Sequence, residues 1–222
     1  MVDGAPASTL ENPLPLGVVL AGGGSRRFGT EKSLFPLSGQ PMAAWVLDAL
    51  RPWTSGQVLI ASSPLAAKTL GVPSRSDLTP GLGPLGGLQT ALEWAGEMGH
   101  ERVMALACDL PMVTPELIGR ILDEWPHGVH AIVPESPGPL GYEPLCAGYE
   151  VAGLPLLEAA IRAGGRSMES GLEALGALRV PRDRLGTEEE VRIAFTNVND
   201  RKRAREVEKM LRAGVSRWGG GS

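Results

Sequence analysis

The sequence predicts an α/β fold built on a mainly parallel sheet. Short apolar runs that end at glycine or at a polar residue are typical of buried strands, and amphipathic helical patterns separate them. This alternation along the chain favours parallel strands joined by helical crossovers. Because no linker divides the chain, we expect one domain over residues 15–213, between a disordered leader (1–14) and a flexible tail (214–222).

The first half of the chain contains three expected strands, each a short apolar run that suits a buried position. They lie at residues 17–21, 57–61 and 103–107. A helix is expected over 41–50, because proline suits a first helical turn and apolar residues follow at intervals of three. The Gly- and Pro-rich stretch 76–88 should begin irregularly and then enter a helix with one apolar face. That face comprises Leu85, Leu88, Leu92 and Ala95.

The second half adds further strands and three helices. The strands are expected at 131–134 and 145–149, with edge strands at 178–181 and 193–196. Thr114 and Pro115 form a helix start, an N-cap followed by proline at the first helical position. A short helix over 154–163 ends at a glycine, and Asp200 is expected to cap the last helix.

Composition excludes several function classes. The net charge of −4 argues against a general nucleic-acid binder, so any anion must be bound by local charge. No run of about 18 apolar residues predicts a membrane span, and the beginning lacks the basic and apolar regions of a signal peptide. Cys108 and Cys146 are expected to be buried thiols, and His100, His127 and His130 lack metal-ligand spacing. Together these features predict a cytoplasmic enzyme.

The stretch VVLAGGGSRRFGTEKSLFPL follows the first strand and has the parts of an anion site. Gly22, Gly23 and Gly24 let backbone N–H groups approach an anion closely, and Arg27 and Lys32 add cationic donors. The spacing fits neither a P-loop nor a dinucleotide fingerprint. A tight strand-to-helix corner would explain the glycines alone, but such a corner needs no arginine or lysine.

Five motifs in order carry a family resemblance. They are LAGGGSRRFGTEK, GPLGGL, CDLP, EPLCAGY and FTNVND, and the match covers most of residues 16–212. The chain resembles the molybdenum cofactor guanylyltransferases, nucleotidyltransferases with a nucleotide-diphosphosugar-transferase-like fold. The resemblance implies a Rossmann-like three-layer α/β/α nucleotidyltransferase fold with a mainly parallel, mixed sheet. It also implies transfer of GMP from GTP to molybdenum-loaded molybdopterin, with Mg²⁺ as cofactor and release of pyrophosphate.

The resemblance also implies roles for particular residues. Lys32 and Arg27 would meet the phosphates, and Asp109 would bind both the nucleotide and Mg²⁺. The remaining nucleotide contacts would come from Leu20, Ala21, Gly22, Gly23, Ser63 and Asp77, where Ser63 stands at a position that is commonly asparagine. Asn197 and Asn199 would contact molybdopterin, from one face of a strand. Two purely structural roles stay open as alternatives: Asp77 serves a turn in its loop, and either Asn199 or Asp200 caps the last helix.

Three alternatives remain for the activity. A molybdopterin cytidylyltransferase or a sugar-phosphate nucleotidyltransferase would use the same loop. A non-catalytic nucleotide-binding module would use the charged last helix as a docking face. The prediction of a guanylyltransferase implies GTP and molybdopterin as substrates. It is compatible with transient contacts to other cofactor-biosynthesis proteins and to acceptor enzymes. It requires neither nucleic acid nor membrane.

Overall fold

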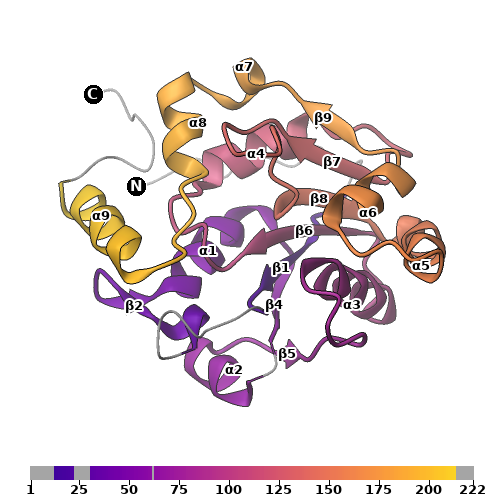
Figure 1. Ribbon diagram of the computed structural model, residues 1–222, viewed down its shortest axis with the longest axis horizontal. Helices are drawn as coiled ribbons and strands as arrows, with labels where there is room; N and C mark the ends of the chain where they lie inside the picture. The colour runs from indigo at the N-terminus through magenta and orange to yellow at the C-terminus, as the bar shows by residue number, and fades with distance from the viewer. Residues whose placement is uncertain (1–12, 23–30, 62, 214–222) are drawn as a thin grey trace.

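A computed structural model describes residues 13–22, 31–61 and 63–213 (Figure 1). Its main sheet has seven strands in the order β5-β4-β1-β6-β8-β7-β9. The strands are β1 (Leu16–Leu20), β4 (Gly56–Ile60), β5 (Ser74–Arg75), β6 (Arg102–Ala107), β7 (Ala131–Pro134), β8 (Cys146–Glu150) and β9 (Leu178–Val180). Only β8 runs antiparallel to its neighbours among these strands. The expected mainly parallel, mixed sheet is therefore confirmed.

Helices cover both faces of the sheet, which gives three layers (Figure 1). They are α1 (Met42–Leu50), α2 (Pro64–Leu70), α3 (Pro84–Glu97), α4 (Pro115–Asp123), α5 (Leu154–Arg162), α6 (Met168–Ala174), α7 (Arg182–Leu185), α8 (Glu188–Ala194) and α9 (Arg201–Arg212). Helices α3, α5 and α6 pack on one face, and α1, α2, α4, α7 and α8 pack on the other. A hairpin of β2 (Pro36–Leu37) and β3 (Gln40–Pro41) lies outside the main sheet.

Strand β1 lies at the centre of the sheet and is buried along its whole length. Its side chains alternate between the two cores, with Val19 in one and Val18 and Leu20 in the other. Strands covered by helices on both faces read as continuous apolar runs, and this is why β1 shows no polar alternation. The chain that leaves β1 therefore emerges from a fully buried central strand.

Helix α9 and the β2–β3 hairpin enclose a third apolar cluster. Leu37 from the hairpin, Met112 after β6, and Val198 and Val207 around α9 are fully buried there. The backbone N–H of Ser38 also donates to the Glu208 carboxylate on α9 at 3.1 Å. This packing fixes the 197–199 segment over the loop that follows β6.

One expected strand is wrong. Residues 193–196 end helix α8 rather than forming an edge strand. A capping box starts this helix: the Thr187 hydroxyl accepts from the Glu190 N–H, and the Glu190 carboxylate accepts from the Thr187 N–H. The helical hydrogen bonds that follow outweigh the strand-like apolar run at 193–196. Helix α6, which begins after the cap Ser167, was not predicted either.

The other expected elements are confirmed, most of them within about two residues at each end. Thr114 caps α4 by accepting from the Leu117 N–H at 3.2 Å, and Cys108 and Cys146 are buried thiols as expected. The expected tail and residues 1–12 of the expected leader lie outside the described residues.

Candidate functional site

Three strands end side by side at one edge of the sheet. In the register, Leu20 of β1 pairs with Ile60 of β4 and with Ala107 of β6. The pairing continues past the strands, because the Ala21 N–H donates to the Ile60 carbonyl at 2.9 Å and the Cys108 N–H donates to the Leu20 carbonyl at 3.0 Å. Ligands of open α/β sheets bind beyond this carboxyl edge, so the residues that follow the three strands form the candidate site.

A lysine, an aspartate and an asparagine meet at this edge. The Lys32 Nζ lies 2.5 Å from Asp109 Oδ2 and donates to Asn199 Oδ1 at 2.8 Å. The side chains of Lys32 and Asp109 are only 17% and 16% exposed, and partial exclusion of water strengthens their attraction. The three residues come from the chain after β1, after β6 and before α9, so the fold itself assembles the cluster.

The 197–199 segment is anchored to the loop that carries Asp109. The Val198 N–H donates to the Asp109 carbonyl at 2.9 Å, and the Val198 side chain is fully buried. Asn199 is therefore placed against Lys32, and it does not cap α9. That role belongs to Asp200, whose carboxylate accepts from the Arg203 N–H at 2.8 Å, as one of the two sequence alternatives stated.

A second group of residues lies beside the end of β1. A Cβ placed on Gly22 would stand 3.7 Å from Asp77 Oδ2, and one on Gly87 of α3 would stand 3.6 Å from Asp77 Oδ1 and 3.4 Å from the Leu20 side chain. Burial raises the pKa of the Asp77 carboxyl. The N-terminus of α3 lies next to these residues, and helix N-termini favour anions. Leu20, Gly22 and Asp77 are thus brought together, and the nucleotide contacts that the resemblance implies for them stay a prediction.

The GPLGGL motif has a structural reason at each of its paired glycines. A Cβ on Gly86 would lie 2.9 Å from the Thr79 carbonyl oxygen, a backbone atom that cannot easily move. At Gly87 the corresponding space is ordinary van der Waals contact with Leu20 and Asp77. Gly86 therefore permits the close turn before α3, and Gly87 leaves room beside the end of β1.

Three predicted residues are less closely tied to the cluster. Ser63 follows β4 at the same edge of the sheet, where it is half-buried and is the N-cap residue of α2. Its hydroxyl makes no capping hydrogen bond in the described part of the chain. Gly23 and Arg27 lie outside the described residues.

Asn197 reaches a different partner from Asn199. Its side chain hydrogen-bonds the Glu143 carboxyl, whereas Asn199 contacts Lys32. The segment has no strand conformation, so the expected alternation of a strand does not apply. Glu143 was not predicted as a functional residue. The available signal was its position in EPLCAGY, a charged residue directly before an apolar run.

Burial raises the pKa of the Glu143 carboxyl, and the nearby negative charge of Asp109 raises it further. The hydrogen bonds from the Leu145 N–H and from Asn197 act in the opposite direction. The carboxyl therefore carries its charge at an energetic cost.

Glu143 and Asn197 line a cavity of about 390 Å³. The size is within the range of small-molecule sites. The other lining residues are Pro84, Ser136, Gly138, Pro139, Leu140, Tyr142, Pro144, Leu145, Arg166, Ser167, Met168, Glu169 and Phe195. Most of this wall is apolar, with polar groups at a few points. The cavity thus lies next to the Lys32–Asp109–Asn199 cluster along the same segment of chain.

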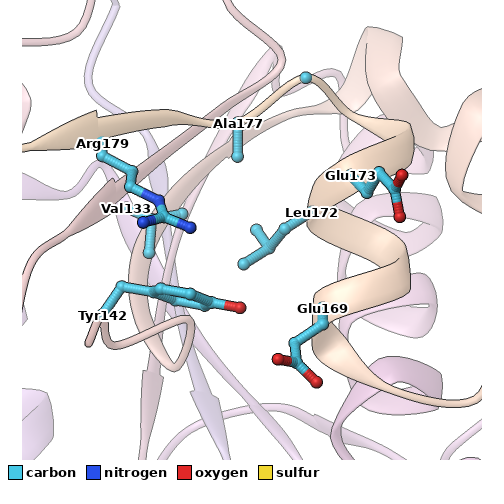
Figure 2. Close-up of a pocket in the computed structure, with 8 residues that line it drawn as sticks. Val133, Tyr142, Glu169, Leu172, Glu173, Ala177 and Arg179 are labelled. Atoms are coloured by element: carbon cyan, nitrogen blue, oxygen red, sulfur yellow. The ribbon is translucent and has the colours of Figure 1, made fainter. Parts of the chain in front are cut away.

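A second cavity, of about 330 Å³, is bordered by Tyr142 (Figure 2). Figure 2 shows Arg179 of β9 over the Tyr142 ring, with the guanidinium carbon 4.7 Å from the ring centroid. Tyr142 and Glu169 line both cavities. The cation–π contact stabilises Tyr142 and so supports the wall between them.

The charged groups of the site suit chemistry on phosphates. In the described residues, no group of three or more His, Cys, Asp or Glu side chains is arranged to hold a metal by itself. None of the helices there combines the length and apolar character needed to cross a bilayer. The Lys32–Asp109–Asn199 cluster instead places an ammonium, a carboxylate and an amide together at the carboxyl edge of the sheet.

Comparison with known proteins agrees with this geometry. The family described as the MobA-like NTP transferase domain matches residues 17–177. A relative named molybdenum cofactor guanylyltransferase, from Rhodobacter capsulatus, is 36% identical over 75% of this chain and 84% of its own. A relative with the name probable molybdenum cofactor guanylyltransferase, from Thermococcus gammatolerans, is 33% identical over 84% of this chain and 95% of its own.

A solved structure has the same fold. The molybdopterin-guanine dinucleotide biosynthesis protein A from Archaeoglobus fulgidus superposes with a TM-score of 0.72 at 27% identity, covering 89% of this chain and 99% of that one. Its similarity extends beyond the residues that the family matches, over most of the described chain. The chain belongs to the family of MobA-like NTP transferase domains.

Proposed function

We propose that the chain is a molybdenum cofactor guanylyltransferase, which transfers GMP from GTP to the terminal phosphate of molybdenum-loaded molybdopterin and releases pyrophosphate. The observation that carries this proposal is the convergence of Lys32, Asp109 and Asn199 beside the end of β1. The names of the relatives from Rhodobacter capsulatus and Thermococcus gammatolerans support it. Nucleotidyltransferase activity follows from the family and from this cluster together.

The residues of the cluster suit the electrostatic demands of the reaction. Transfer at a phosphate needs in-line positioning and neutralisation of charge more than covalent help from the protein. Lys32 would stabilise the charge that develops on the pyrophosphate leaving group. The attacking phosphate is already ionised, so the site needs no general base. Asn199 holds the Lys32 ammonium in place through its 2.8 Å hydrogen bond.

The donor set at Asp109 fits Mg²⁺. This ion prefers oxygen ligands and commonly takes one or two protein carboxylates together with phosphate oxygens and water. Asp109 supplies one carboxylate and Asn199 an amide oxygen within reach of the same lysine. When bound, Mg²⁺ would neutralise charge on the phosphate oxygens. Lys32, with three N–H donors, holds the Asp109 carboxylate in a fixed orientation for that ion.

The two sides of the site would take the two substrates. On the α3 side, Leu20, Gly22 and Asp77 would contact GTP. The proposal also assigns nucleotide contacts to Ser63, Gly23 and Arg27, as the resemblance implies. On the other side, Asn197 and its cavity would take molybdopterin, and Asn199 would lie between the two. The proposal includes a cytoplasmic location and transient contacts with proteins that supply molybdopterin or receive the product.

Pyrophosphate release tests the proposal and its alternatives. The chain is incubated with Mg²⁺, with GTP, CTP or UTP, and with either molybdenum-loaded molybdopterin or a sugar phosphate as acceptor. We expect pyrophosphate with GTP and loss of the signal in Asp109→Asn. Preference for CTP would instead identify a cytidylyltransferase, and release only with a sugar phosphate as acceptor would identify a sugar-phosphate enzyme. Release with no combination would contradict catalysis and favour a binding module.

A further inference from the structure

We propose that Glu143 selects the acceptor, by accepting two hydrogen bonds from the amino-pyrimidinone edge of a pterin ring bound in the cavity that it shares with Asn197. This inference rests on the proposed function, because that function supplies a pterin as acceptor. It adds a specificity-determining residue that lies outside the Lys32–Asp109–Asn199 cluster.

The backbone around Glu143 is fixed at the edge of the sheet. The Glu143 N–H donates to the Pro134 carbonyl at 2.9 Å, and the Glu143 carbonyl accepts from the Cys146 N–H at 3.2 Å. The next turn is tied to β6, because the Ala107 N–H donates to the Leu145 carbonyl at 2.7 Å. Glu143 is therefore a preorganised carboxyl beside the strand that leads to Asp109.

The Glu143 carboxyl lacks a cationic partner in the described part of the chain. None of the ion pairs found there includes it. Its protein partners are the Leu145 N–H, at 3.4 Å from Oε1, and the Asn197 side chain. A mostly buried carboxylate is costly without strong donors. An ionised carboxylate has about four lone-pair sites, so Glu143 can still accept hydrogen bonds from a ligand.

The lining of the cavity suits a heterocycle with an apolar face and a polar edge. Pro84, Leu140 and Phe195 contribute apolar surface, while Glu143 and Asn197 place polar groups on the same lining. Small-molecule sites typically combine such apolar walls with a few placed polar groups that fix orientation. On a neighbouring part of the wall, the guanidinium of Arg179 lies over the Tyr142 ring (Figure 2).

The chemistry of the ring edge matches a carboxylate. In a pterin, the ring N3–H and the 2-amino group point the same way and form two parallel donors, as the guanidinium of arginine does. A carboxylate accepts such a pair with both oxygens, which is the geometry of the strong bidentate pairs. Glutamine in the same place offers one acceptor and one donor, so it would oppose one of the two ring groups.

The position of the cavity is consistent with the transfer. Asn197 and Asn199 flank the buried Val198 and reach Glu143 and Lys32 respectively. A ring held at Glu143 would therefore leave its phosphate-bearing side chain next to the cluster that holds the nucleotide phosphates. The 197–199 segment would thus connect the cavity that binds the acceptor ring with the Lys32–Asp109–Asn199 cluster, where the transfer takes place.

Equilibrium binding of two probes tests the inference. The probes are pterin and lumazine, which has a carbonyl where pterin has the 2-amino group, and both are titrated into the full chain with GTP present. Hydrogen bonds to a charged group are worth about 1.5–3 kcal/mol, so we expect pterin to bind about tenfold or more tightly than lumazine. Glu143→Gln should abolish this preference. Glu116→Gln, which changes an exposed carboxylate on α4 that does not line the cavity, should keep it.

Kinetics provide a second readout. With molybdopterin as acceptor, Glu143→Gln should raise the KM for the acceptor at least tenfold and leave the KM for GTP unchanged. The inference is overturned if wild-type chain binds pterin no better than lumazine, if it binds neither, or if Glu143→Gln retains the preference. The wild-type comparison does not depend on any variant folding.

The two proposals fail in different ways. Pyrophosphate release that depends on GTP and molybdopterin, together with an unchanged pterin preference in Glu143→Gln, would refute the role of Glu143 alone. A Glu143-dependent pterin preference without any nucleotidyl transfer would support ring recognition and contradict the proposed reaction.

Discussion

Replacing Lys32 by methionine removes a positive charge that joins the phosphate-binding and metal-binding parts of the proposed site. Methionine keeps a long unbranched side chain, so the change mainly deletes the ammonium. In the protein the Lys32 Nζ lies 2.5 Å from Asp109 Oδ2 and 2.8 Å from Asn199 Oδ1. At an effective dielectric constant of about 20, the first distance corresponds to a gross attraction of about 7 kcal/mol, which desolvation of the two groups largely offsets.

The net effects on stability and on catalysis follow from this geometry. Asp109 would keep a carboxylate that is only 16% exposed and has lost its cation, so we expect a loss of about 1–3 kcal/mol in the free energy of unfolding. Loss of one donor that stabilises charge in the transition state costs about 10²–10³ in rate, or about 2.7–4 kcal/mol. The kcat/KM for GTP should therefore fall more than the stability loss could explain.

Pyrophosphate release measures kcat/KM, and urea denaturation of the same samples measures stability. Lys209→Met is the matched control, because Lys209 is an exposed lysine near the end of α9, and it should change neither quantity. An active Lys32→Met variant with unchanged kcat/KM would refute the assignment of Lys32 to the phosphates. A variant that loses stability without losing activity would leave Lys32 only a structural role.

Three further outcomes are expected. Gly86→Ala should lower the free energy of unfolding by about 1–3 kcal/mol, since its Cβ would meet the Thr79 carbonyl at 2.9 Å. Gly87→Ala should leave the free energy of unfolding unchanged but weaken GTP binding. Thermal unfolding and nucleotide titrations of both variants distinguish the two effects. Glu143→Gln should be more stable than the wild type at neutral pH, because burial raises the pKa of Glu143 and the stability of the wild type falls as pH rises through that raised pKa. Denaturation at several pH values should show the stability difference between variant and wild type shrinking as pH falls. A stability difference that stays constant with pH would contradict this prediction. The buried Cys108 thiol, whose pKa burial raises to about 12, should resist a thiol reagent in the native state and react after unfolding; rapid native labelling would contradict its burial.

The fold and the family were predictable because they depend on local signals. The apolar run of β1, the Thr114–Pro115 helix start and the glycine motifs each act within a few residues. Their order along the chain predicted the mixed α/β sheet, which the structure confirms. At 193–196 two local signals compete. The apolar run suggested a strand, but the capping box at Thr187, several residues earlier, starts a helix that continues into this run.

The recognition side of the site was less predictable because it depends on long-range packing. Lys32 and Asn199 are 167 positions apart in the sequence, and a family resemblance rather than periodicity linked them. Asn197 was expected beside Asn199, but the backbone at Val198 is held by Asp109 and sends the two amides to different partners. Glu143 becomes recognisable as a site residue only in the folded chain, where β8 pairs antiparallel with β6 and the turn that precedes β8 lies against the end of β6.

A crystal structure of the chain with GTP and Mn²⁺, in place of Mg²⁺, tests the central claim most directly. The account predicts an anomalous Mn²⁺ peak at the Asp109 carboxylate, GTP phosphates at the Lys32 ammonium, and the nucleoside on the side of Asp77 and α3. A triphosphate bound elsewhere, or an Mn²⁺ ion bound without Asp109, would contradict it.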